Sequence, residues 1–377
     1  MNLPKNQSAF LWGARKTGKS TYLKQHFPNS IYYDFLKSDE YLRYLKAPHK
    51  LREELLAIGD SPYHIIIDEV QKVPQILDEI QWLIENANLS FILCGSSARK
   101  LKRTGANLLG GRAWKYHFFP LVYSEITDFS LLKVLNHGCV PSHYQTANPK
   151  KALKSYIEDY LVHEIQAEGL VRSLPGFARF LDIMPFSNGE MINFTNISRE
   201  VAIDAKTVKE YFHILEDTLL GYFIYPYSKK VNREIITSQP KFYLFDVGLA
   251  THLSKNHFET IEGSQAGKAL ENYILQEIVA YNSMQELDYK INCWRTKTGL
   301  EVDFLVNEKI AIEVKISANI HPTYLNGIKA INEELTIDKS IIVCMETKER
   351  LIKVNEHQIR IMPVEVFLKA LWEGYIF

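Results

Sequence analysis

A loop near the amino terminus limits what this chain can fold into more than any other feature. It follows the apolar run Ala9–Trp12 and reads G-x-x-x-x-G-K-S. Its glycines allow a tight turn with inward-pointing backbone N–H groups, which form an anion-binding concavity at the start of a helix. The lysine suits phosphate groups and the serine hydroxyl suits Mg²⁺, so the loop predicts a site for ATP or GTP. The residues expected to bind nucleotide are Gly13, Ala14, Arg15, Lys16, Thr17, Gly18, Lys19, Ser20 and Thr21.

A second motif is an apolar strand that ends in two acids. Ile65, Ile66 and Ile67 are followed by Asp68 and Glu69. Buried parallel strands read as continuous β-branched runs, and active groups gather at their carboxyl ends. We expect Asp68 to hold Mg²⁺ with Ser20, directly or through water. Glu69 is the expected base that polarises water against the γ-phosphate, which favours ATP hydrolysis over passive nucleotide binding.

Two further features concern the same site. The strand that ends at Cys94 is followed by Ser96 and Ser97. Ser96 is expected to contact the γ-phosphate or orient water, although either serine could instead cap the next helix. Arg112, on the glycine-rich turn that begins at Leu109, is the first candidate for an arginine finger, and Arg99 is the second. Each arginine could equally be a solvated charge, and an arginine finger could act within one subunit or across a homo-oligomer.

Composition limits the class of protein. At 377 residues the chain is too long for one core, which favours two or three domains. No apolar run approaches eighteen residues, so we expect no membrane span, and residues 1–12 lack signal-peptide features, which predicts a cytoplasmic protein. Lysine plus arginine equals aspartate plus glutamate at 44 each, so any DNA binding must come from local patches.

The order of patterns predicts an α/β chain in three parts. Residues 1–140 alternate apolar strands with amphipathic helices, which indicates a parallel sheet in a P-loop NTPase domain. Residues 150–240 are predicted to hold a helical segment and a winged helix-turn-helix, and residues 241–377 a second α/β domain. The strands of the first part are expected near 8–12, 30–35, 63–67, 89–94 and 114–119.

The predicted helix-turn-helix is a candidate DNA-binding unit. Ser198 is expected to cap a short helix, Lys206–Leu220 to form a longer one, and Tyr222–Tyr227 with Ile235–Ser238 to form a wing. Between residues 197 and 218 there are three basic side chains against five acidic ones. Phosphate contacts supply most of the affinity for DNA, so Lys229–Arg233 in the wing suits that role better. The alternative is a purely structural lid on the ATPase.

The carboxyl-terminal third carries a second set of candidate catalytic residues. Residues 299–306 and 309–316 read as a hairpin, with Val302, Phe304 and the other apolar residues of that parity on one face. Asp303, Glu313 and Lys315 share the other face, and a turn near residue 308 places Asp303 opposite Glu313. Two facing carboxylates beside a lysine suit Mg²⁺ or Mn²⁺ held by Asp303 and Glu313, with Lys315 near the attacking water or scissile phosphate.

Glu271 is expected to point toward the same site. It lies on the apolar stripe of a helix over 267–281, where an unpaired acid would be costly. The alternative for the whole set is a solvated sheet face with cross-strand pairing between glutamate and lysine. The spacing alone leaves both interpretations open.

Taken in order, these motifs, together with Phe242–Leu249 and the W-R-T-K-T-G-x-E-V-D-F run from Trp294, resemble a family of bacterial and archaeal AAA-type ATPases. The carboxyl-terminal domain of that family was long catalogued as of unknown function. This part of the chain is similar to the PD-(D/E)XK, or restriction-endonuclease-like, fold. The resemblance implies that Asp303, Glu313 and Lys315 are the motif residues and that Glu271 is the helical glutamate.

Two hypotheses follow from this resemblance. The first is an ATP-hydrolysing protein coupled to a metal-dependent nuclease that acts on DNA. The second is an ATP-dependent switch whose carboxyl-terminal domain binds nucleic acid or a protein partner without cleavage.

Overall fold

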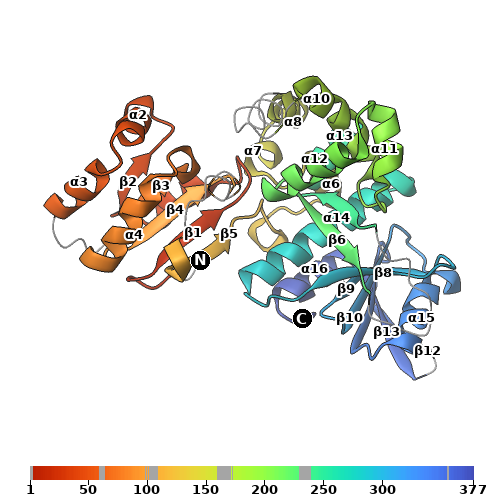
Figure 1. Ribbon diagram of the computed structural model, residues 1–377. Helices are drawn as coiled ribbons and strands as arrows, with labels where there is room; N and C mark the ends of the chain where they lie inside the picture. Colours follow the sequence, from red (N-terminus) through yellow and green to blue (C-terminus); the bar gives the residue numbers. More distant parts are fainter. Residues whose placement is uncertain are drawn as a thin grey trace. The chain divides into compact units, whose positions relative to one another are not determined.

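The computed structural model describes residues 3–58, 64–97, 99, 101, 109–158, 171, 173–228, 239–354 and 356–377 (Figure 1). Contacts group the chain into two compact units. The first comprises Met1–Pro120 with Asp217–Leu219, and the second comprises Leu121–Glu216 with Leu220–Phe377. The three-part division expected at 1–140, 150–240 and 241–377 stays a proposal.

In the first unit, the described strands form one parallel sheet in the order β2-β3-β4-β1-β5. Its inner strands are buried runs of apolar residues, and α2, α3 and α4 lie beside them in Figure 1. The predicted parallel sheet is therefore confirmed. The elements are β1 (Ser8–Trp12), α1 (Lys19–His26), β2 (Ile31–Asp34), α2 (Ser38–Lys46), α3 (Lys50–Ile58), β3 (Ile65–Asp68), η1 (Val70–Lys72), α4 (Ile76–Ala87), β4 (Phe91–Gly95), η2 (Leu109–Gly111) and β5 (Ala113–His117).

The second unit is built on a mixed sheet in the order β12-β13-β11-β10-β9-β8-β6-β7. Side chains of α14 and α16 pack on one face, and those of α15 pack on the other. The strands are β6 (Gly221–Pro226), β7 (Lys241–Leu244), β8 (Ile291–Arg295), β9 (Glu301–Val306), β10 (Ile310–Lys315), β11 (Lys339–Cys344), β12 (Arg350–Val354) and β13 (His357–Pro363). The helices are η3 (Tyr123–Glu125), α6 (Leu131–His137), α7 (Pro141–Tyr144), α8 (Pro149–Ser155), α10 (Leu174–Ile183), η5 (Met184–Ser187), α11 (Phe194–Val201), α12 (Ala205–Asp217), α13 (Val247–Leu253), α14 (Gly263–Met284), η6 (Pro322–Leu325), α15 (Asn326–Glu334) and α16 (Val364–Trp372).

Residues 121–140 group with the second unit, where two buried carboxylates accept hydrogen bonds from their backbone N–H groups. Both oxygens of Glu277, on α14, accept hydrogen bonds from the N–H of Tyr123, at 3.0 and 3.2 Å. Asp246 accepts from the N–H of Cys139 at 2.6 Å and of Val140 at 3.3 Å. These bonds satisfy buried polar groups on both sides, so they attach the segment firmly to α13 and α14.

The helical pair differs from its prediction in two details. Asn193, rather than Ser198, caps α11, because its side chain accepts from the N–H of Asn196 whereas Ser198 lies inside the helix and bonds to a carbonyl one turn back. Residues 222–226 belong to β6, which pairs with β7 and β8 and is therefore part of the large sheet. The other wing segments, 229–233 and 235–238, lie outside the described residues.

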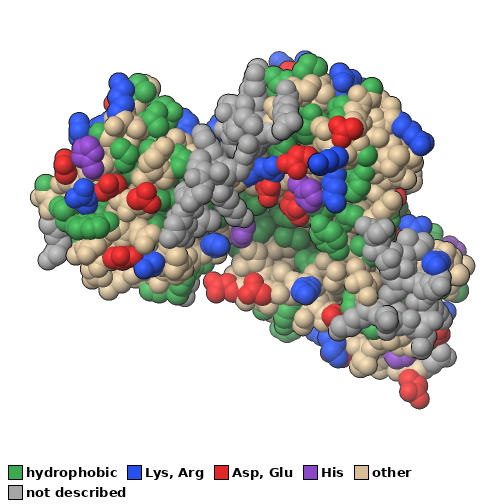
Figure 2. Space-filling model, in the orientation of Figure 1, with side chains coloured by type: hydrophobic (Ala, Val, Ile, Leu, Met, Phe, Trp, Pro, Cys, Tyr) green, Lys and Arg blue, Asp and Glu red, His purple; other side chains and the backbone are tan. Residues whose placement is uncertain are grey.

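Figure 2 shows one face of the molecule, and the residues coloured there give no strong sign of one partner class. On the face shown in Figure 2, lysine and arginine side chains are interspersed with aspartate and glutamate. This mixture matches the balanced composition and gives no continuous basic surface among the residues coloured there. Within the described ranges, no helix is long and apolar enough to cross a bilayer.

Candidate functional site

The phosphate loop lies at the carboxyl end of β1, between β4 and β5. Gly13 is required there, because an added Cβ would lie 2.4 Å from the carbonyl oxygen of Phe118. Gly18 has a φ of 102° at the N-cap of α1, a left-handed conformation that glycine adopts without strain. These two positions explain the spacing of the motif. They turn the backbone between β1 and α1.

Lys19 is folded back onto its own loop. Its Nζ donates to the carbonyl of Gly13 at 2.6 Å and to that of Ala14 at 2.8 Å. Burial lowers the pKa of this ammonium from its ordinary value, and the charges of Glu69 and Asp68 oppose that shift. The loop carbonyls thus hold the cation that a phosphate would attract.

Ser20 and Asp68 are brought together as expected of a magnesium site. The Ser20 hydroxyl donates to Oδ2 of Asp68 at 2.6 Å, and the hydroxyl of Tyr32, the second residue of β2, donates to the same oxygen at 2.5 Å. A hydroxyl and a carboxylate are hard oxygen ligands that suit Mg²⁺. Tyr32 was not identified from the sequence. The only available signal was its place in the strand beside β3.

Glu69 is held by a glutamine that the sequence analysis also missed. It has a left-handed backbone (φ 59°) and is buried. Its Oε2 accepts from Nε2 of Gln71 at 2.6 Å, and the same amide donates to Oγ of Ser96 at 3.2 Å. Gln71 therefore links the expected base to the expected sensor. The signal was a polar residue two positions after Glu69, between Val70 and Lys72.

The two serines after β4 have different contacts. Ser96 faces Gln71, whereas the Ser97 hydroxyl accepts from the N–H of Arg99, as a helix cap does. Arg99 in turn pairs with Asp217, one of the three later residues that group with the first unit. Arg99, the second candidate for an arginine finger, is thus held by an ion pair.

Arg112 lies at the opposite edge of the sheet from the phosphate loop. It precedes Ala113, which pairs with Ser8, so it lies level with the start of β1. Arg112 is therefore level with Gln7, and Gly13 lies six residues farther along the chain, just after β1, which is about 20 Å at the usual rise per residue. Arg112 instead pairs with Glu85 at 2.7 Å, each side chain being 40% exposed. This separation places Arg112 away from the phosphate loop of its own unit.

In the second unit, the predicted carboxylates meet where the β9–β10 ladder ends. The ladder pairs Ile312 with Phe304, and Glu313 and Asp303 are the next residues along. Instead of continuing the ladder, the N–H of Asp303 donates to Oε2 of Glu313 at 3.2 Å, and the N–H of Val314 donates to Oδ2 of Asp303 at 2.9 Å. The predicted register is confirmed. Lys315 pairs with Oε1 of Glu313 at 2.5 Å.

The predicted apolar face of the hairpin needs one correction. Between the pairs Asn292–Leu305 and Trp294–Val302, β9 carries one residue more than β8. This bulge reverses the alternation of side chains, so Val302 packs with Leu305 in the core under α15 rather than with Phe304. Asp303 and Phe304 are the two residues of β9 that lie opposite the single residue Cys293 of β8 in this bulge.

Glu271 reaches the same cluster through a lysine. Lys241, the first residue of β7, lies 2.9 Å from Oε1 of Glu271 and 3.5 Å from Oδ1 of Asp303, with its side chain only 9% exposed. Tyr243 also donates to Glu271, at 2.5 Å. Burial alone would lower the pKa of Lys241, but the charges of Glu271, Tyr243 and Asp303 raise it well above its ordinary value. The sequence analysis missed Lys241, a lone lysine at the start of an apolar strand.

The donor set of this acidic cluster fits a divalent cation in chemistry but not in its present arrangement. Its three carboxylates outnumber its two lysines, which leaves one formal negative charge. Burial and the charge of Asp303 raise the pKa of Glu313 well above its ordinary value. Among the described residues, however, no three acidic, histidine or cysteine side chains are grouped closely enough to hold a metal. Lys241 lies where a cation would bridge Glu271 and Asp303.

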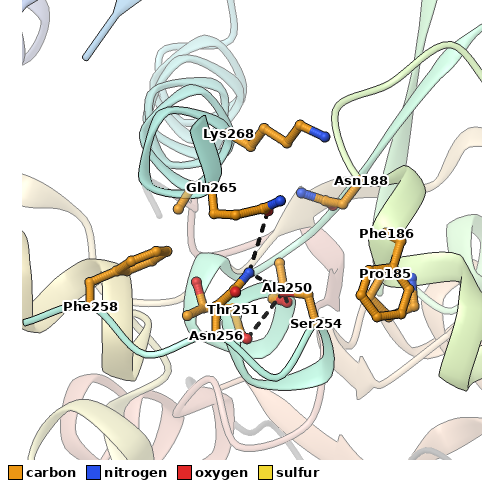
Figure 3. A pocket seen from close by; sticks show the side chains of 11 residues that line it. Pro185, Phe186, Asn188, Ala250, Thr251, Ser254, Asn256, Phe258, Gln265 and Lys268 are labelled. Carbon is orange, nitrogen blue, oxygen red and sulfur yellow. Dashed lines mark hydrogen bonds between the residues drawn. The ribbon is translucent and has the colours of Figure 1, made fainter. Parts of the chain in front are cut away.

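A separate pocket lies one turn along α14 from Glu271 (Figure 3). It is lined by Asn188, Asn256, Gln265 and Lys268 beside apolar side chains, and Asn256 bonds to Ser254 and Gln265 there. The cavity has a volume of about 20 Å³, room for a single water molecule. It is too small for a substrate.

Comparison with protein families assigns the first unit. Residues 5–127 match the model of a family described as AAA domain. Over these residues the chain is similar to AAA-type P-loop domains. Residues 129–260 and 266–367 match two families described as domains of unknown function, DUF8612 and DUF4143. The AAA match indicates a nucleotide-binding ATPase, whereas the other two add no activity.

Relatives extend over most of the chain. The protein described as Uncharacterized protein MJ1544 from Methanocaldococcus jannaschii is 22% identical over 401 aligned residues, which cover 95% of this chain and 87% of that protein. Uncharacterized protein Rv2008c from Mycobacterium tuberculosis and Uncharacterized protein Mb2031c from Mycobacterium bovis are each 22% identical over 264 residues. Those alignments cover 68% of this chain and 59% of each mycobacterial protein.

Proposed function

We propose that this protein binds ATP with Mg²⁺ and hydrolyses it in its first unit. The contact between the Ser20 hydroxyl and the Asp68 carboxylate, beside Lys19 of the loop, carries this proposal. When bound, Mg²⁺ neutralises phosphate charge during transfer. Lys19 exchanges the loop carbonyls for phosphate oxygens, and Ser20 with Asp68 holds the ion. Phosphate release from ATP tests the proposal.

Glu69 is the proposed base. Its carboxylate takes a proton from the attacking water, which makes the water a stronger nucleophile. The amide of Gln71 orients this carboxylate and also contacts Ser96, so the base and the proposed sensor are positioned by one side chain. A single glutamine thereby fixes the relation between the two groups.

Arg112 can assist catalysis only at the nucleotide of a second copy. In that case Arg112→Ala lowers turnover by about 10³-fold or more while ATP affinity stays unchanged. Mixing Arg112→Ala chains with Lys19→Ala chains restores part of the turnover, because each supplies what the other lacks. The measurement is phosphate release from each variant and from the mixture.

Glu85→Ala is the matched control for Arg112. It removes the partner of the surface ion pair but keeps the arginine, so turnover should stay at the wild-type level. Unchanged turnover in Arg112→Ala would show that the arginine is only part of that surface pair. A mixture no faster than its components would exclude action between copies.

The second proposed activity is metal-dependent cleavage of DNA at the acidic cluster. The convergence of Glu271, Asp303, Glu313 and Lys315 at one ladder end favours it, as does the excess negative charge. Asp303 and Glu313 would hold Mg²⁺ or Mn²⁺, which polarises the scissile phosphate. Lys315 would orient the attacking water or stabilise charge on the phosphate.

Cleavage is tested with plasmid DNA, linear DNA and RNA, with either metal, with and without ATP. Asp303→Asn and Lys315→Ala are expected to abolish cleavage of DNA, whereas Lys309→Ala, an exposed-turn control on the same hairpin, retains it. If the wild type cleaves none of these substrates, the alternative holds. The protein is then an ATP-dependent switch whose carboxyl-terminal domain binds a partner without cleavage.

A further inference from the structure

We infer that Lys241 is a built-in competitor for the divalent cation, occupying the position between Glu271 and Asp303 until a metal displaces it. This inference rests on the proposed metal-dependent site and adds its regulation. The ammonium lies 2.9 Å from one carboxylate and 3.5 Å from the other, so it is the cation now shared by these two acids.

Burial explains why a cation is required at this position. The side chains of Lys241, Glu271 and Asp303 are 9%, 16% and 4% exposed, so little water solvates their charges. A buried carboxylate without a partner is strongly unfavourable. Lys241 therefore stabilises the two acids when no metal is bound.

The other lysine of the cluster cannot take this role. Lys315 pairs with Glu313, which lies two residues before it on β10, and the Lys315 side chain is 26% exposed. Lys241 comes from β7, at the far edge of the sheet order, and reaches acids on α14 and β9. Displacing Lys241 frees Asp303, one of the two proposed metal ligands, and leaves Glu271 beside it for the metal, while Lys315 keeps its place on Glu313.

Lys241 and the metal exclude each other for a simple electrostatic reason. Two cations that share the same carboxylate oxygens at these distances repel in a poorly solvated site. Metal binding in the wild type must therefore include the cost of moving Lys241 away. Removing its charge removes that cost and leaves one more negative charge for the metal.

The test is calorimetric titration of MnCl₂ into the full nucleotide-free chain. Lys241→Met is expected to bind Mn²⁺ about 10- to 100-fold more tightly than the wild type, the range seen for partners of metal ligands. The gain should disappear in the double variant Lys241→Met/Asp303→Asn. Without metal, the melting temperature of Lys241→Met should fall, and Mn²⁺ should restore it.

Two controls separate charge from structure. Lys241→Arg keeps the charge and should bind Mn²⁺ no better than the wild type. Lys268→Met removes a lysine of α14 that pairs with Glu190, and it should also leave Mn²⁺ affinity unchanged. If Lys241→Met does not fold, Lys241→Gln, which keeps a donor for Glu271, gives the same comparison.

Each outcome decides the inference. Tighter Mn²⁺ binding in Lys241→Met upholds it, even if the wild type cleaves no DNA. Equal, measurable affinity in wild type and variant overturns it and leaves the proposed nuclease site standing. Absence of binding in both overturns the inference and the metal site together.

Discussion

The variant Glu69→Gln is expected to bind ATP as tightly as the wild type and to lose about 10²- to 10⁴-fold in turnover. The amide keeps the shape of the side chain and can still accept from Gln71, whose Nε2 lies 2.6 Å from Oε2 of Glu69. It cannot take a proton from water at neutral pH. Binding is measured by titration of ATP with Mg²⁺, and turnover by phosphate release.

Glu53→Gln is the matched control for this variant. Glu53 is an exposed acid on α3, and the same substitution there should leave turnover unchanged. Hydrolysis by Glu69→Gln at the wild-type rate would show that Glu69 is not the base. Loss of ATP binding in Glu69→Gln would instead assign Glu69 a role in holding the nucleotide.

The second large effect is expected for Lys19→Ala, which should abolish ATP binding. Lys19 is the lysine of the G-x-x-x-x-G-K-S pattern. Its Nζ lies 2.6 and 2.8 Å from two loop carbonyl oxygens, which it can exchange for phosphate oxygens. Without it the triphosphate loses the buried cation of the loop, and the backbone N–H groups alone do not replace that charge. Titration of ATP with Mg²⁺ into the variant gives the result.

Lys16→Ala separates this specific loss from a general loss of positive charge. Lys16 is an exposed lysine in the same loop, with a φ of 61° that alanine tolerates about as well. It should retain ATP binding within a few-fold, because this loop position is expected to offer the phosphates its backbone N–H, which alanine keeps. Retained binding in Lys19→Ala would contradict the assigned role of the lysine, while equal losses in both variants would indicate charge alone.

The first unit was predictable because its signals are local. A glycine loop, a β-branched run and two acids follow one another within single elements, so the sequence places them without knowledge of distant contacts. The register of the β9–β10 hairpin was predictable for the same reason, since a short turn fixes which residues face each other.

The features that the sequence analysis did not predict depend on contacts between distant parts of the chain. The bulge that turns Val302 to the other core depends on pairing with β8, and the joining of β6 to the large sheet depends on β7 and β8. Lys241 is about 30 residues from Glu271 and about 60 from Asp303, so no local pattern connects it to them. The glycine-rich turn made Arg112 a candidate from the sequence, whereas its position at the opposite edge of the sheet from the phosphate loop depends on strand direction and pairing.

Phosphate release from ATP by the purified full chain, with Mg²⁺ and again with excess EDTA, tests the central claim most directly. We predict steady release with Mg²⁺ that stops when EDTA is added and that Glu69→Gln reduces to near background. The Ser20–Asp68 contact places both proposed magnesium ligands beside the loop lysine, so the ion should be essential. No release above the Glu69→Gln level, or release that persists in EDTA, would contradict this account.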